Sequence, residues 1–266
     1  MKGILLMMLA AFALWGDFQG LGVSPSLESG QAYHTSLLMP IHAEALLAKA
    51  QALGWWIRVQ QGMEVSYYQG SERCTACTPA LEGQFFQFPQ LVLDGNLSMV
   101  RLDTAAFRLN LRPMVDSGMI YELVVVMKQT LDAETLSNQI QQELSSLGLI
   151  LPVGLSFAAL PLSAKAKAPV PQGVRLDETL FRLTQAPDWP DFATLQGLSL
   201  SGLRVRAVVE VSEGQTPSAR FDLLIEGQAS SGMRAQVLIP DLLALAQDPA
   251  VAQVRAPLQP QAGGGS

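Results

Sequence analysis

The chain has 266 residues, of which 49% are hydrophobic and only 15% are charged, so it has enough apolar material for a large core. Its formal net charge is -6, and its 17 Lys and Arg residues are spread thinly. This pattern argues against nucleic acid as a partner, because phosphate binding needs clustered cations. The length is compatible with one long β-type domain or with two smaller ones.

The chain begins with a short apolar segment. Residues 3–15, GILLMMLAAFALW, follow Lys2 and are too few to cross a hydrocarbon layer of roughly 30 Å as a helix. Their length fits the apolar region of a secretory signal, which has about 7 to 15 residues. We therefore interpret residues 1–17 as a signal peptide or an N-terminal anchor. We expect an exported protein that is periplasmic or membrane-anchored facing the periplasm, and a buried apolar N-terminus is the alternative.

The first predicted half of the fold, residues 33–168, begins with a strand, a helix and a second strand. In TSLLMPIHAEALLAKAQALGWWIRVQ, the helix is expected from about His42 to Leu53. Gly54 supplies the position that ends it, and the next strand is expected at Trp55 to Gln60.

The only two cysteines, Cys74 and Cys77, lie in the stretch SERCTACTP. A disulfide needs Cα atoms within about 7 Å, which a turn can supply across two intervening residues, and an exported protein favours a disulfide. A thioredoxin-like redox pair is less favoured, because no helical periodicity follows it. We predict no metal site, since zinc would need two more ligands and His34 and His42 do not form a second pair with suitable spacing.

Alternating apolar residues predict antiparallel strands in both halves. FPQLVLDGNLSMVRLDTAAFRLNLRP alternates on either side of a turn at residues 94–96, and GLSLSGLRVRAVVEVSEGQ alternates in the second half, residues 174–257. Many strands with few helices predict an α+β fold, a curved and largely antiparallel sheet with two or three amphipathic helices packed on one face. We expect the second half to be continuous with the first, and residues 258–266 to be a disordered tail or an added linker.

The clearest amphipathic helix is predicted in QTLDAETLSNQIQQELSSLGLILP, with Asp132 as its N-cap and Gly148 at its end. Its apolar face consists of four residues that recur at intervals of 4, 4 and 3 positions, namely Leu136, Ile140, Leu144 and Leu147. This face either fills a closed core or forms one wall of an apolar groove that holds acyl chains. In the second case, Val124 and Val126 of the preceding strand would form the opposite wall.

Two proline-containing stretches interrupt the predicted strands. Residues 161–173 are expected to be an exposed edge strand guarded by Lys165 and Lys167, or a linker between the halves. Any domain boundary would fall there. The stretch from Thr184 to Gly197 is expected to be a loop.

Common catalytic motifs are missing from the sequence. It contains no G-x-S-x-G elbow, no P-loop and no G-x-G-x-x-G that opens a helix. His34 and His42 suggest neither a triad nor a metal pair, and the adjacent acids Asp177 and Glu178 are typical of a helix start. We therefore predict that the protein is not an enzyme and uses no cofactor.

The stretch from Leu91 to Leu147 resembles a known family. Its strands LSMVRLDTAAFRLNLRP and MIYELVVVMK, followed by the polar helix start TLDAETLSNQI, are similar to those of LmeA-like phospholipid-binding proteins of actinobacterial and cyanobacterial envelopes. The apolar N-terminus and the strand LSLSGLRVRAVVEV also resemble AsmA-like or YdgA-like periplasmic proteins. Both resemblances imply the cell envelope and a lipid ligand, and neither implies a catalytic residue.

From these patterns we expect a non-enzymatic lipid-binding or lipid-transfer protein of the bacterial cell envelope. The expected partners are phospholipid or another acyl-chain lipid, and the membrane surface. The alternative is a structural or assembly component of an envelope machine. Such a component would bind protein partners along exposed edge strands such as Ser163 to Ala168.

Overall fold

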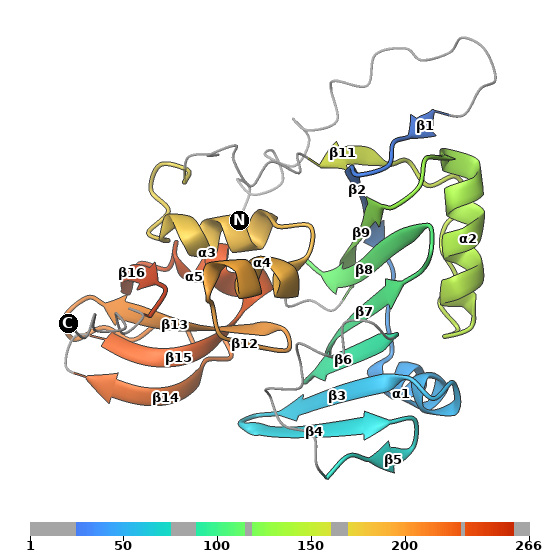
Figure 1. The fold of residues 1–266 in the computed structure, drawn as a ribbon. Helices are drawn as coiled ribbons and strands as arrows, with labels where there is room; N and C mark the ends of the chain where they lie inside the picture. Colours follow the sequence, from blue (N-terminus) through green and yellow to red (C-terminus); the bar gives the residue numbers. More distant parts are fainter. Residues whose placement is uncertain (1–24, 76–88, 115–118, 161–169, 230–231, 258–266) are drawn as a thin grey trace, which may run out of the picture.

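The computed structural model describes residues 25–75, 89–114, 119–160, 170–229 and 232–257. These residues form an α+β fold in which helices pack against open, largely antiparallel sheets, which confirms the predicted fold class (Figure 1). The strands are divided between a nine-stranded sheet, a five-stranded sheet and a separate two-stranded pair. We refer to the nine-stranded sheet with its helices as the first lobe, and to the five-stranded sheet with its helices as the second lobe.

The first lobe is built on one twisted sheet. Its strands are β2 (Ala32–Leu38), β3 (Trp56–Gln61), β4 (Glu64–Gln69), β5 (Glu72–Arg73), β6 (Gln90–Asp94), β7 (Leu97–Asp103), β8 (Phe107–Pro113), β9 (Ile120–Met127) and β11 (Ala158–Leu160). They lie in the order β11-β2-β9-β8-β7-β6-β3-β4-β5, and all neighbours are antiparallel except β3 and β6. The short strands β1 (Ser26–Leu27) and β10 (Leu131–Asp132) pair with each other beside it.

Two helices, α1 (Ala43–Ala52) and α2 (Ala133–Ser145), contribute to the core on one face of this sheet. The helix predicted at His42 to Leu53 is α1. The helix predicted after Asp132 is α2, and the Asp132 side chain accepts a hydrogen bond from the Thr135 N–H at 2.7 Å. The cap that the sequence predicts therefore starts the helix, because this bond satisfies one of the N–H groups that have no partner within the helix.

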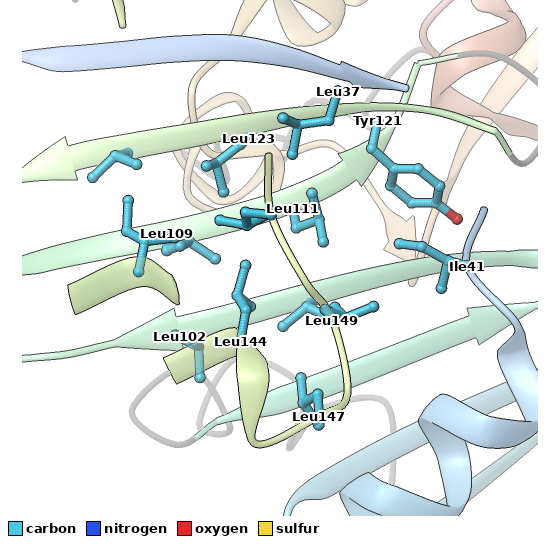
Figure 2. Packing of buried hydrophobic residues seen from close by; sticks show 14 of the residues in the cluster. Leu37, Ile41, Leu102, Leu109, Leu111, Tyr121, Leu123, Leu144, Leu147 and Leu149 are labelled. Carbon is cyan, nitrogen blue, oxygen red and sulfur yellow. The ribbon is translucent and has the colours of Figure 1, made fainter. Parts of the chain in front are cut away.

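The core of the first lobe lies between these helices and the sheet. It includes the four apolar residues predicted to share one face of α2, namely Leu136, Ile140, Leu144 and Leu147. The first three are fully buried and Leu147 is nearly so. Figure 2 shows Leu144 and Leu147 among side chains that come from the strands of the sheet. The helix thus docks through the stripe that its 3.6-residue period creates.

The second lobe combines a smaller sheet with three helices. Its strands are β12 (Leu200–Ser201), β13 (Arg204–Val211), β14 (Leu224–Ala229), β15 (Gly232–Leu238) and β16 (Val251–Arg255), and its helices are α3 (Glu178–Gln185), α4 (Trp189–Gln196) and α5 (Leu242–Leu245), the last preceded by a 3-10 turn at Ile239–Asp241. The strand order is β12-β13-β15-β14, and β16 also pairs with β13. Inward-facing residues of the sheet and apolar residues of the three helices form one buried cluster.

The prediction of a loop from Thr184 to Gly197 is wrong, because this stretch contains the whole of α4. Asp188 caps the helix by accepting a hydrogen bond from the Asp191 N–H at 3.1 Å. Pro190 lies in the first turn, where its missing N–H has no helical partner to lose. Gly197 ends the helix with a left-handed φ of 65°, a conformation that glycine adopts at little cost.

Several sequence predictions fall outside the described residues. They concern the signal or anchor at residues 1–17, the edge strand at Ser163 to Ala168 and the tail at residues 258–266. Cys74 follows β5, but Cys77 lies outside the described residues, so the disulfide stays a prediction. None of the helices in the described ranges is both long enough and apolar enough to span a membrane.

Candidate functional site

The second lobe packs against the sheet face that lies opposite the α1 and α2 core. Val92 of β6 and Leu97 and Met99 of β7 are buried on this face and belong to the apolar cluster of the second lobe. The lobes therefore share a core at their junction, although no described strand of one lobe pairs with a named strand of the other. The domain boundary predicted within residues 161–173 stays a prediction.

Two arginines of the first lobe bind the N-terminal turn of α4. The Arg101 Nη2 donates to Asp188 Oδ2 at 2.8 Å and to Asp191 Oδ1 at 3.3 Å. Arg108 donates to the same two carboxylates. Because Asp188 also caps α4, one carboxylate both starts this helix and ties it to the sheet.

Arg112 of β8 makes a second link to the same region. Its Nε and Nη2 donate to Glu122 Oε2 at 2.9 and 2.7 Å, and its Nη1 donates to the Ala186 carbonyl. The guanidinium carbon lies 4.7 Å from the centre of the Trp189 ring, within the range of a cation–π contact. The His34 Nδ1 lies 2.8 Å from the other oxygen of Glu122.

The carboxyl group of Glu122 is buried, but its ionised form is still favoured over its neutral form. Burial by itself raises the pKa of this group. The hydrogen bond with His34 and the charge of Arg112 outweigh burial, so the pKa of Glu122 lies below its ordinary value. Protonation of Glu122 at acidic pH therefore weakens the charged network between the lobes.

A third link is formed by a buried ion pair between Arg204 of β13 and Asp94 of β6. The Arg204 Nε and Nη2 donate to the two oxygens of Asp94 at 2.7 and 2.9 Å, a bidentate arrangement, and Nη2 also donates to Asp222 at 2.6 Å. Burial opposes the charge of Arg204, but the hydrogen bond and charge of Asp94, assisted by Asp222, outweigh it and raise the pKa of the guanidinium.

A cleft of about 170 Å³ lies between these links, where the face of β3, β4, β6 and β7 meets α4 and β12. Its walls are mostly apolar or aromatic, with contributions from Trp56, Ile57, Tyr67, Leu91, Val92, Met99, Pro190, Ala193, Leu198 and Leu200. Gln90, Thr194 and Arg58 supply polar groups. Thr194 is exposed and Trp56 is half-buried, so these two residues lie where the cleft meets the surface. A concave apolar space with few polar groups is the usual form of a small-molecule site.

Arg58 crosses the cleft from the first lobe to the second. It is only 6% exposed, and its Nη2 donates to Ser201 Oγ at 2.6 Å. Gly202 follows with a left-handed φ of 62°, and a Cβ atom there would lie 2.2 Å from Arg58 Nη1. Glycine is therefore required at this turn both for its backbone conformation and for the approach of the guanidinium.

The residues predicted from the sequence to line a lipid groove lie in two different places. The three apolar residues of α2 and Leu147, which follows the end of the helix, come together in the closed core of the first lobe. On β9, Leu123 and Val125 belong to that core, whereas Val124 and Val126 lie on the opposite face because successive side chains of a strand alternate. The structure therefore does not bring the two valines to α2. None of these residues lines the cleft among the described residues.

Within the described part of the chain, no three His, Cys, Asp or Glu side chains are grouped in a way that could hold a metal ion. No family model, curated protein or solved structure matches the chain. The resemblances to LmeA-like and to AsmA-like or YdgA-like proteins therefore stay predictions.

Sequence reasoning missed the cleft, although some of its signals were present. Trp56 and Arg58 lie two positions apart in a predicted strand, so they share one face, and a buried arginine there calls for a polar partner. The pattern Asp188 to Pro190 also marks a helix start. The pairing of Arg58 with Ser201, 143 residues further along the chain, leaves no local pattern.

Proposed function

We propose that the protein is a non-enzymatic binding protein of the bacterial cell envelope that holds the apolar part of a lipid or another small amphiphile in the cleft between its lobes. The observation that carries this proposal is the cleft itself, which combines apolar walls with a few polar groups. The apolar segment at residues 3–15, interpreted as a signal or anchor, supports the envelope location.

The size of the cleft limits which part of an amphiphile it holds. An apolar cavity of about 150 Å³ binds one benzene molecule. The cleft, at about 170 Å³, therefore fits one ring or a chain segment of about six carbons. We infer that a longer acyl chain enters only in part, so the protein binds one segment of its ligand and does not enclose whole lipid chains.

The apolar face of α2 supports lipid binding less well than the cleft does. Leu136, Ile140 and Leu144 are fully buried against the sheet. Each such side chain contributes roughly 1.5–3 kcal/mol through burial, so opening this face to a ligand would cost several kcal/mol. The cleft is already open and requires no such displacement.

Blocking the cleft tests the proposal directly. Thr194 is exposed and lines the cleft, so Thr194→Trp fills the opening without disturbing a buried position. We expect the wild type to bind octanol or octanoate in calorimetric titrations and Thr194→Trp to bind either at least tenfold more weakly. The matched control is Leu195→Trp, on the same helix and 81% exposed, which should bind like the wild type. A folded wild type that binds neither ligand would refute the proposal.

A second candidate function is assembly through an edge strand, and β14 favours it. This strand lies at the edge of the second sheet, its sequence LIEGQA has neither lysine nor proline, and Ile225 is 50% exposed. Lysine and proline commonly protect such edges against pairing with other chains. A photo-crosslinker at Gln228 should then capture a protein partner in cells, and Ile225→Lys should abolish the adduct. An adduct that persists in this variant would argue against pairing along β14.

A further inference from the structure

We infer that the edge strand β14 binds an extended segment of a partner protein that carries an acidic side chain, and that Arg234 recognises this acid. The inference rests on the second candidate function, because it names the partner of the same edge. The partner segment pairs with the exposed residues Gly227, Gln228 and Ala229 and places an aspartate or a glutamate opposite Gly227. This site is separate from the cleft between the lobes, with which it shares no described lining residue.

A groove of about 520 Å³ lies beside β14, at the edge of the second sheet (Figure 1). Four consecutive residues of this strand, from Glu226 to Ala229, line the groove together with residues of β13, β15 and β16. Gly227 contributes no side chain, and a Cβ atom added there would have no atom within 4 Å apart from its chain neighbours. The surface beside the edge is therefore open at this position and has room for a side chain of an added strand.

Most of the charges around the groove are already paired. Arg255 Nε donates to Glu210 Oε1 at 2.7 Å, so these two charges balance each other. Glu226 accepts hydrogen bonds from Nε and Nη2 of Arg206 at 3.0 and 2.9 Å. Arg234 is exposed and attracts Glu226 electrostatically, but it forms neither a hydrogen bond nor an ion pair with the part of the chain that the structure describes. Its guanidinium can therefore donate to the carboxylate of an acidic partner.

The strand register brings Arg234 within reach of a partner at this edge. Arg234 of β15 lies directly opposite Gly227, and the regular part of β14 begins there because its register shifts between Ile225 and Gly227. Neighbouring strands lie about 4.8 Å apart, so a residue of an added strand opposite Gly227 has its Cα about 10 Å from that of Arg234. The long side chains of an arginine and a glutamate together cover this distance, and Gly227 places no side chain between them. A bidentate pair of this kind also fixes the register of the added strand.

The test places a photo-crosslinker at Gln228 of the full chain, in the cells that naturally produce it, and identifies the captured segment by mass spectrometry. We expect the segment to contain an aspartate or a glutamate. Arg234→Glu should reduce the adduct about tenfold or more, because two acidic side chains then face each other. Exchange of that acid in the partner for arginine should restore the adduct with Arg234→Glu and weaken it with the wild type.

The matched control is Arg220→Glu, the same change of charge at an exposed position of the same lobe, which should keep the adduct. Gly227→Val gives a second test in which Arg234 is unchanged. A branched side chain then lies between Arg234 and the partner strand, so this variant should reduce the adduct severalfold. Circular dichroism checks that each variant folds.

The outcomes separate the inference from the candidate function on which it rests. If Ile225→Lys abolishes the adduct and Arg234→Glu does not, the inference is overturned and pairing along β14 remains. A captured segment without an acidic residue also overturns the inference alone. If neither variant changes the adduct, or if no adduct forms, both are overturned.

Discussion

The two faces of the nine-stranded sheet are built in opposite ways. On β8, Leu109 and Leu111 are fully buried in the core with α2, whereas the alternating residues Asn110 and Arg112 face the second lobe. The first face is sealed mainly by apolar packing, to which a buried hydrogen bond between the hydroxyl groups of Ser98 and Tyr121, 3.0 Å apart, is added. The second face meets a lobe that comes later in the chain, and buried charges with directed hydrogen bonds determine how the lobes fit together.

This difference explains where the cleft lies. Apolar side chains that interdigitate leave few voids, because each can shift to fill the space beside its neighbour. Charged groups must instead keep their partners at fixed distances, as Arg101 does with Asp188 and Arg204 does with Asp94. The charged links hold the lobes together at separate points, and the cleft remains between them. A ligand site is therefore expected on the second face and not under α2.

The largest expected effect comes from breaking the buried ion pair between the lobes. Arg204→Met leaves Asp94 as a buried charge without its bidentate partner, and should lower the free energy of unfolding by about 3–5 kcal/mol. The double variant Arg204→Met with Asp94→Leu removes both charges and should recover most of this loss. Urea unfolding of the three proteins measures it. A double variant as unstable as the single one would show that the loss does not come from the unpaired carboxylate.

On the first face, under α2, substitutions should change stability through the loss of apolar packing and not through the loss of charge. Ile140→Ala removes buried methylene groups from the core under α2, and should cost about 3 kcal/mol of unfolding free energy, independent of salt. Glu143→Ala, at an exposed position of the same helix, should change stability by less than about 0.5 kcal/mol. Ligand binding in the cleft should stay unchanged in both folded variants. A change in octanol affinity in Ile140→Ala would show that the two faces are coupled.

Asp188 at the start of α4 has two roles, helix capping and ion pairing, and two substitutions separate them. Asp188→Asn keeps a side chain that caps helices well but removes the charge that Arg101 and Arg108 bind, and should cost about 2 kcal/mol. Asp188→Ala removes the cap as well and should cost roughly 1 kcal/mol more. Urea unfolding distinguishes the two steps. Equal stability of the two variants would mean that capping by Asp188 contributes nothing.

The first face could be predicted from the sequence and the second could not. The spacing from Leu136 to Leu147 and the cap at Asp132 are local signals, so α2 and its apolar stripe were predicted, whereas the sequence left open whether this stripe fills a core or faces a ligand. The face of β9 that meets α2 was not predicted, because the strand is apolar at every position but one; the exception, Glu122, shares its face with Val124 and Val126 and is the signal that this set lies away from α2. The partners on the second face lie far apart in the chain, as Arg101 and Asp188 do at positions that differ by 87.

The smallest expected effect concerns pH and is confined to the second face. The pKa of Glu122 is lowered on folding by His34 and Arg112, so its contribution to stability is complete above the ordinary value of about 4.5 and is lost as pH falls through the lower, folded value. Glu122→Gln cannot titrate, and should be less stable than the wild type at neutral pH because Arg112 loses its charged partner. Its urea midpoint should then fall less than that of the wild type as the pH is lowered from neutral to below 4.5. Glu143→Gln, at an exposed position of α2, should keep the wild-type profile. Parallel profiles for Glu122→Gln and the wild type would show that the carboxyl of Glu122 does not link the lobes to pH.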